Sequence, residues 1–401
     1  MLPVSNRPRR LVLLGIIASL AVLLGSAAFV QERNDAIQRG MDARVRELQA
    51  AWNARSFARP VAWGEVAPGN AFDHYDLATS RAAELLRADN DALVATLRRS
   101  DAEVAEQTGE LRARWQPVVD ALRAGAHAER AMPPLQPIDG APTGVNGLLS
   151  CRWVANAAVF AARAARHEGR GVEAVQHTLD AAAFGADIAR HGTLIQQMIG
   201  VAMLTIGSGE AWPEPALARL DQDALSLLAD GLERIDRSLP PWLDQDAELL
   251  FLARALRSQP ASGDGATRAP WRFLFSEQWM VADAFDRVAD LAAELARTRQ
   301  LPWPQRQALI EQECATIANG DNPLAANCVP NLANAESCLR EGIASLRLLR
   351  MAVDRHLGRD LPPVRDPLGD GPIRVRVTDE GVRLWCAGDD QRPNRARLVA
   401  R

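Results

Sequence analysis

Apolar residues recur every three or four positions over most of this chain, which is the period of an α-helix with one buried face. The clearest such stripe lies near the C-terminus and consists of Leu332, Ala335, Leu339, Ile343, Leu346, Leu349, Val353 and Leu357. The same period predicts helices over about 73–88, 90–126, 145–168, 171–190, 193–208, 214–237, 241–258, 270–298, 303–319 and 331–358. The fold class expected from this pattern is all-α.

The first apolar stretch has no polar face. Residues 11–30 carry no charge and follow a basic segment, residues 1–10, that contains three arginines. About 20 apolar residues suffice to cross a bilayer, and preceding arginines favour a cytoplasmic N-terminus. We therefore expect an N-terminal transmembrane helix at 11–30, placed in the inner membrane as a single span, with the body of the chain in the periplasm. A cleaved signal peptide is the alternative, because residues 25–28 are small.

Breaks in the helical pattern divide the rest of the chain. Residues 31–126 are expected to form a membrane-proximal helical region. Four prolines within residues 127–143 mark a linker, because proline removes a backbone donor and breaks helices. A multi-helix exported body is expected at 144–360, followed at 361–401 by a short C-terminal β-hairpin and tail.

The hairpin is predicted from a change of period. Between residues 373 and 386 apolar and polar positions alternate in two short runs, which is the pattern of strands with one buried face. Gly381 can supply the positive φ that a tight turn requires. An isolated two-stranded ribbon is marginal, so its apolar face should rest on the last helix. We expect Val375 and Leu384 to be buried, and Arg374 and Arg376 to be exposed.

Composition limits the chemistry. Apolar residues make up 48% of the 401 residues, enough to fill a core, and all 46 basic residues are arginine. Without lysine the chain has no phosphate-loop lysine, no Schiff-base amine and no lysine general base. Without the three arginines of residues 1–10, 43 basic residues face 50 acidic ones. This acidic balance excludes nucleic acid as an expected partner.

One cluster of titratable residues is a candidate for catalysis. Asp73, His74 and Asp76 stand together, and an Asp/His set can bind a metal ion or share a proton. The competing interpretation is a capped helix start, since aspartate is favoured there. Capping is likewise expected for Asp221 and Asp244, which precede apolar periodic runs. The chain lacks the HExxH, GxSxG and GxGxxG motifs, and no cofactor is expected.

Cysteines suggest a second kind of site. Cys314, Cys328 and Cys338 lie within 25 residues, and in an oxidising compartment disulfides among them are possible, with the connectivity open. Cys151 is expected to be a small residue of the core.

A local resemblance accompanies the hairpin. The residues that carry it are Asp366, Pro367, Gly369, Pro372, Gly388 and Asp390. This tail resembles the C-terminal part of the major pseudopilins of type II secretion, and more closely the tails of uncharacterised single-pass envelope proteins of GC-rich bacteria. The pseudopilin resemblance implies a calcium loop at Asp389 and Asp390. The chain departs from that family at Leu368, where an aromatic residue is usual, at the additional Gly371, and in lacking a processing motif.

These observations favour a membrane-anchored envelope protein that acts as a non-catalytic helical binding or scaffolding module facing the periplasm. Its expected partners are the inner membrane, through residues 11–30, and other envelope proteins. One alternative is a metal-assisted hydrolase using Asp73, His74 and Asp76. The other is a component of a secretion or pilus-like assembly.

Overall fold

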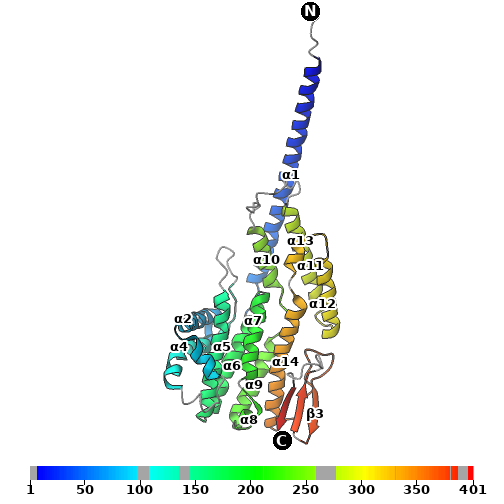
Figure 1. Ribbon diagram of the computed structural model, residues 1–401. Helices are drawn as coiled ribbons and strands as arrows, with labels where there is room; N and C mark the ends of the chain where they lie inside the picture. Colours follow the sequence, from blue (N-terminus) through cyan, green and yellow to red (C-terminus); the bar gives the residue numbers. More distant parts are fainter. Residues whose placement is uncertain are drawn as a thin grey trace, which may run out of the picture.

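The computed structural model describes residues 7–97, 108–134, 145–210, 212–258, 277–329, 331–379, 381–386 and 396–400. It is mostly helical, as the apolar period predicts (Figure 1). The helices are α1 Arg7–Asn53, α2 Ala71–Leu97, α4 Thr108–Ala126, α5 Val145–His167, α6 Gly171–His191, α7 Leu194–Thr205, η1 Ile206–Glu210, α8 Glu214–Leu217, α9 Gln222–Ser238, α10 Asp246–Ser258, α11 Glu277–Arg297, α12 Trp303–Ala318, α13 Pro323–Cys328 and α14 Leu332–His356. The strands are β1 Ala67–Asn70, β2 Ala128–Arg130, β3 Arg374–Thr378, β4 Gly381–Trp385 and β5 Ala396–Ala400.

The N-terminal segment differs from the transmembrane helix expected at residues 11–30. Among the residues that the structure describes, no helix is both long enough and apolar enough to cross a membrane, so the predicted transmembrane helix is wrong. Residues 11–30 belong to α1, a helix of 47 residues that continues without a break into a polar sequence. The first part of α1 stands away from the body, and its last turns pack beside α10 and α11 (Figure 1). Met41, Val45 and Trp52 are buried there together with Leu250 and Phe285.

Helix α6 is the centre of the body. Most of its side chains are buried on all sides, which is typical of a helix enclosed by others. Its packing on α7 is unusually close, because a Cβ atom on Gly200 would lie 2.3 Å from the backbone N of Ala189 and 2.6 Å from the carbonyl O of Gly185. These two glycines let the two backbones meet, and this contact fixes α6 against α7.

Two large apolar clusters share α6. One joins α6 to α9 and α14 and contains Leu179, Leu228 and Leu349, and the other joins it to α2, α4 and α5 through Tyr75, Trp115 and Phe184. The helices on both sides of the proline-rich stretch 127–143 therefore share one core. Part of that stretch, residues 135–144, lies outside the described residues.

The C-terminal sheet extends the predicted hairpin. Strands β3 and β4 pair antiparallel with Val375 opposite Leu384, and Gly381 has the expected positive φ of 149°. The sheet has a third strand, because β5 pairs antiparallel with β4 in the order β3-β4-β5. A second small sheet joins β1 to β2 in parallel. The prediction of a lone hairpin is thus corrected to three strands, and the two-stranded sheet lies in the helical region where none was expected.

The sheet is only partly covered by helices. Leu384 is fully buried and Val382 nearly so, as predicted for the face that rests on α14. Val375 is 45% exposed, which contradicts its predicted burial, and Val377 is 70% exposed. The reason is position, because the contacts of α14 with the sheet are to β4 and β5, so β3 projects beyond the helix. Arg374 and Arg376 are exposed as predicted.

Candidate functional site: an ionic network along helix α6

A stripe of polar residues crosses the buried helix α6. Glu173, His177, Asp180, Asp187 and His191 follow one another at intervals of four, three, seven and four residues, which places them on one face of the helix. Except for Glu173 and His191, these side chains have at most 4% exposure. A charge in such surroundings is stable only when it is paired, so the partners of this face define the site.

Asp187 holds the first group. Its Oδ2 atom accepts a hydrogen bond of 2.7 Å from the Tyr75 hydroxyl and lies 3.1 Å from Arg59 Nε as an ion pair. Arg190 Nη2 lies 3.4 Å from the other oxygen and donates to Ser238 Oγ. Arg59 also donates to the carbonyl of Gly125. Burial first, and then the Asp187 charge, raise the pKa of Tyr75 well above its ordinary value, so Tyr75 is a neutral donor.

Asp180 holds the second group, about two helical turns toward the N-terminus of α6. Trp63 Nε1 donates to Oδ1 at 2.7 Å, and Arg123 Nε donates to Oδ2 at 2.9 Å. The Arg123 guanidinium also stacks over the Trp63 ring, with 5.1 Å from Cζ to the ring centroid. Burial raises the pKa of Asp180, while the bonds from Arg123 and Trp63 oppose this shift. His127 packs edge-on against Trp63 with its Nε2 atom 3.9 Å from Asp180.

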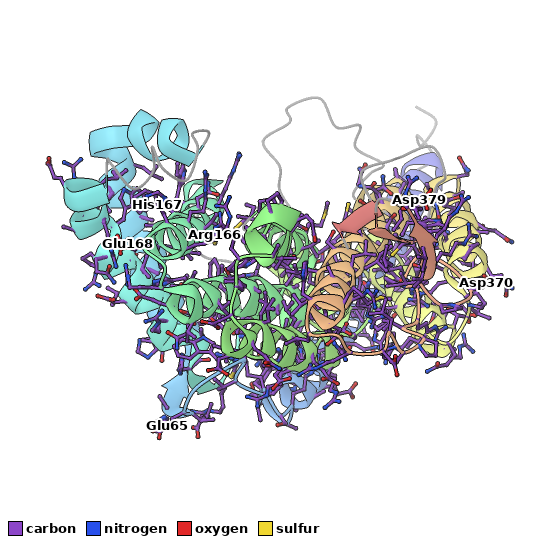
Figure 2. All side chains as sticks on the ribbon, turned by 90° about the horizontal axis from the view of Figure 1, so that it is seen from below. Glu65, Arg166, His167, Glu168, Asp370 and Asp379 are labelled. Carbon is purple, nitrogen blue, oxygen red and sulfur yellow. The ribbon has the colours of Figure 1, made fainter. Side chains whose placement is uncertain are left out.

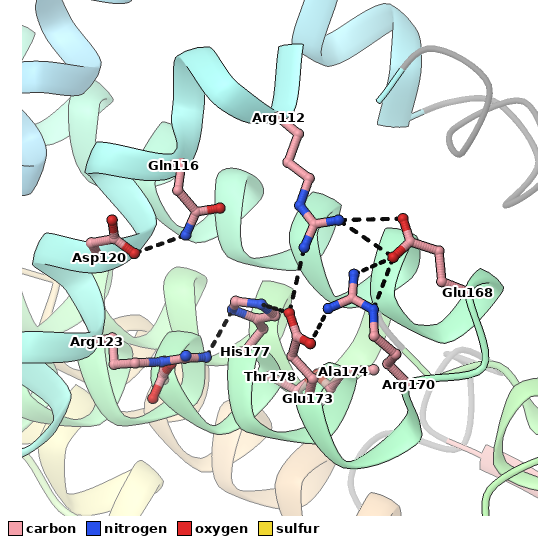
Figure 3. A network of polar contacts seen from close by, with 11 residues as sticks. Arg112, Gln116, Asp120, Arg123, Glu168, Arg170, Glu173, Ala174, His177 and Thr178 are labelled. Atoms are coloured by element: carbon pink, nitrogen blue, oxygen red, sulfur yellow. Dashed lines mark hydrogen bonds and ion pairs between the residues drawn. The ribbon is translucent and has the colours of Figure 1, made fainter. Parts of the chain in front are cut away.

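His177 connects this group to the surface (Figure 3). Arg123 Nη2 lies 3.2 Å from His177 Nδ1, and Glu173 Oε1 lies 3.6 Å from Nε2. Since the guanidinium can only donate, Nδ1 is assigned as the acceptor and the imidazole proton is on Nε2, facing Glu173. Burial first, and then the Arg123 charge, lower the pKa of His177 to about 4, so it is neutral at pH 7.

The outer end of the network is a cluster of ion pairs on the surface. Arg170 bonds both Glu168 and Glu173, and Arg112 on α4 reaches the same two carboxylates at 3.3 and 3.5 Å (Figure 3). The hydrogen bond from Arg170 is the main cause that lowers the pKa of Glu168. Glu168 is seen at the end of α5 beside Arg166 and His167 (Figure 2).

The other end of α6 meets the residues that lead into helix α10. His191 Nδ1 lies 3.2 Å from Asp244 Oδ2, and Arg55 grips the two oxygens of Asp244 at 3.2 and 2.7 Å. Arg55 also bonds Asp246. Burial opposes ionisation of Asp244, but the bonds from His191 and Arg55 together lower its pKa. Asp244 was predicted as a simple helix cap, and it does accept a hydrogen bond from the backbone N of Asp246, yet its main partners are the side chains of Arg55 and His191.

The network joins α6 to the linking segment, defined as residues 54–66 between α1 and β1. Arg59 binds Asp187, Trp63 binds Asp180, and Phe57 packs edge-on against His191 at 5.3 Å. The linking segment therefore runs antiparallel to α6 and is held at three points. Because these carboxylates are already engaged by cations and donors, the arrangement positions a chain segment rather than exposing a reactive group.

The candidate residues Asp73, His74 and Asp76 lie on the first turns of α2. Asp73 and Asp76 are exposed and His74 is half-buried, and burial together with the nearby Asp73 charge raises the pKa of Asp76. Within the described residues, no group of three or more His, Cys, Asp or Glu side chains can hold a metal ion. None of the described residues adds a ligand to this set, and Asp73 occupies the helix start where a cap was the competing interpretation. By contrast, Asp221 caps α9 as predicted, accepting from the N of Ala224.

The remaining predicted sites divide between described and undescribed parts of the chain. Cys314, Cys328 and Cys338 form no disulfide in the described structure, and Cys151 is partly buried on α5. Burial raises the pKa of Cys151 to about 12, which makes its thiol inert at neutral pH and fits a packing role. The proposed calcium ligands Asp389 and Asp390 lie outside the described residues. Comparisons with family models, with curated proteins and with solved structures found no match to this chain.

Proposed function

We propose that this protein acts by binding, as a helical scaffold in which the ionic network fixes helix α1 relative to the body. The observation that carries the proposal is the antiparallel run of the linking segment along α6, held by Asp187, Asp180 and His191. Helix α1 leaves the body as a long projecting rod (Figure 1). A rod that projects from a rigid joint suits a protein that spaces or presents other molecules.

Two further contacts support a rigid joint. The end of α1 is buried against α10 and α11, so the rod is packed on the body before the linking segment begins. The linking segment also pairs with β2, since the N of Arg59 donates to the carbonyl of Glu129 and Ala58 forms an antiparallel bridge with Arg130. Burying the network costs desolvation energy, and such buried polar groups can be retained because they specify one arrangement.

Hydrogen exchange followed by mass spectrometry tests the joint. In the variant Asp187→Asn we expect amides of the linking segment to exchange faster than in the wild-type chain, by about tenfold or more, while α14 keeps its protection. The exposed substitution Asp230→Asn on α9 is the matched control and should change neither region. Equal protection of the linking segment in all three chains contradicts the proposal.

The hydrolase interpretation is separated by metal analysis of the purified chain. Stoichiometric zinc or manganese that is lost in His74→Ala would favour a metal-dependent enzyme and overturn a purely binding function. The location at the periplasmic face and the envelope partners inferred from sequence remain predictions, which cell fractionation and pull-down from membranes would test.

A further inference from the structure

The outer strand of the C-terminal sheet has an open edge. In the order β3-β4-β5, strand β3 has β4 on one side and no second strand among the described residues on the other. The N–H of Ile373 donates to the carbonyl of Val364 at 2.8 Å, so it points away from β4. Alternate residues of an antiparallel strand direct their backbone groups to the same side. The N–H and C=O groups of Val375 and Val377 therefore face the open edge.

A short segment of the same chain already pairs with the residues that lead into β3 on this side. Residues 364–366 pair with residues 371–373 in antiparallel fashion, through the bridge between Arg365 and Pro372 and the bond from Asp366 N to Gly371 O. Strand β3 continues beyond this short pairing. An added strand would lie on the same side of β3, from residue 374 onward. Residues 361–363, which lead into this pairing, make no backbone hydrogen bond to β3, so the backbone groups of β3 on that side are available to an added strand.

The two faces of β3 differ in character. Val375 and Val377 lie on the face that carries buried Leu384 and Val382, yet they are 45% and 70% exposed. The opposite face carries Arg374 and Arg376 on β3, Arg383 on β4 and Arg365 on the adjoining segment, and all four arginines are exposed. Asp370 and Asp379 flank this region, on the side of the molecule opposite Glu65 and Glu168 in the view from below (Figure 2). An exposed strand with valines on one face and arginines on the other favours an added strand whose side chains are apolar on the first face and acidic on the second.

We propose that β3 is a docking edge for an extended segment of a partner protein in which apolar and acidic side chains alternate. Acidic residues of the added strand would lie opposite the arginines, while its apolar residues would cover Val375 and Val377. A second copy of this chain is the less suitable occupant. Antiparallel pairing of two β3 strands would place Arg374 and Arg376 of both copies on the same face, where like charges repel. The proposal deepens the binding function above and rests on it.

Fluorescence anisotropy with synthetic octapeptides tests the edge on the full-length chain. The probe alternates valine with glutamate, and the comparison peptide carries lysine in place of glutamate. We expect the glutamate probe to bind about tenfold or more tightly than the lysine peptide, because strand addition fixes the backbone while the arginines select the charge. Equal binding of the two peptides, or no binding of either, overturns the proposal.

Two variants separate backbone from charge. Val377→Pro removes an N–H that faces the open edge and does not bond to β4. It should therefore weaken binding of the glutamate probe about tenfold while changing the stability of the fold little. The double variant Arg374→Glu with Arg376→Glu should reverse the preference toward the lysine peptide. Its matched control is Arg39→Glu with Arg46→Glu, two exposed positions of α1 away from the sheet, which changes net charge equally. If this control reverses the preference too, the effect is one of net charge and the edge is excluded.

Sedimentation velocity of the same chains tests whether a second copy of this chain occupies the edge instead. A dimer that Val377→Pro abolishes would assign the edge to a second copy and overturn the proposal of an acidic partner. A failed peptide experiment leaves the hydrogen-exchange result on the linking segment unchanged, so failure of the docking edge and failure of the rigid joint are separate outcomes.

Discussion

Trp63 Nε1 donates a hydrogen bond of 2.7 Å to Asp180 Oδ1, joining two residues that are 117 positions apart in the chain. Asp180 is fully buried, and Arg123 occupies its second oxygen. One carboxylate therefore holds together the linking segment, α4 and α6. The consequences of this arrangement can be measured as stability and as pH dependence.

Removal of a network carboxylate should be costly. Asp187→Ala leaves Arg59 with only 1% side-chain exposure and without its counter-charge, and leaves the Tyr75 hydroxyl without its acceptor. Breaking a buried pair in this way typically costs about 3–5 kcal/mol. Chemical denaturation should show this loss, while Asp223→Ala at an exposed position of α9 should stay within about 1 kcal/mol. Similar midpoints for the two variants would contradict the network's energetic role.

Acid should destabilise the fold through His177. Its pKa is about 4 in the folded chain and 6.5 for an unperturbed histidine, so the unfolded state binds the proton more readily. The stability that neutral His177 contributes is present above about pH 6.5 and is lost as the pH falls toward 4. A shift of this size corresponds to roughly 3 kcal/mol.

The variant His177→Gln isolates that contribution. Its free energy of unfolding should fall less steeply than the wild-type value between about pH 6.5 and pH 4, because no imidazole remains to be protonated. His74→Gln, at the half-buried position on α2, is the matched control and should retain the wild-type slope. Identical slopes in His177→Gln and the wild-type chain would mean that His177 is not held neutral by its surroundings.

A second buried ionic group joins α12, α14 and the turn before β3. Glu336 bonds both Arg306 and Arg340, and Arg340 donates to the carbonyl of Pro367. Glu336→Gln removes the negative charge and leaves two buried guanidinium groups facing each other. We expect a loss of about 3–5 kcal/mol in thermal or chemical unfolding. Glu311→Gln makes the same chemical change at an exposed position and should be nearly neutral.

The close contact of α6 with α7 predicts a strong effect from a single methyl group. In Gly200→Ala the new Cβ would lie 2.3 Å from the N of Ala189, and backbone atoms cannot yield as a flexible side chain can. We expect a loss of at least about 3 kcal/mol, as for severe overpacking. Gly40→Ala on α1 meets nothing within 4 Å and should instead gain about 0.5–1 kcal/mol from helix propensity. Thermal unfolding of both variants is the measurement.

The period of apolar residues was sufficient to predict an element where one face of it is buried along its whole length. The stripe ending at Leu357 predicted a helix over 331–358, and α14 spans Leu332–His356. Strand β5 was missed because the arginines of 391–401 dominate that stretch and its apolar pair, Leu398 and Val399, is too short to show a period. The parallel sheet was missed for the same reason, since β1 has four residues and β2 three.

The ionic network was partly visible in the sequence. Glu173, His177 and Asp180 stand at intervals of four and three in an alanine-rich helix, which marks one polar face on a buried element. Their partners were not predictable, because Arg59 and Trp63 belong to a segment without helix or strand period. The partners are far apart in the sequence, as in the separation of 117 residues between Trp63 and Asp180, so no local pattern of residues indicates that they pair.

The sheet itself provides the last prediction, since one of its faces is covered by α14 over β4 and left open over β3. Leu384 and Val375 are opposite each other in the register, but Leu384 is fully buried and Val375 is 45% exposed. Leu384→Ala should cost about 2–5 kcal/mol, because it removes methyl groups from the contact between β4 and α14 and leaves a cavity. Val375→Ala should cost about 0.5–1 kcal/mol, because most of that side chain is already in water. Chemical denaturation of the two variants measures the difference, and equal costs would mean that the side chain of Val375 is covered as completely as that of Leu384.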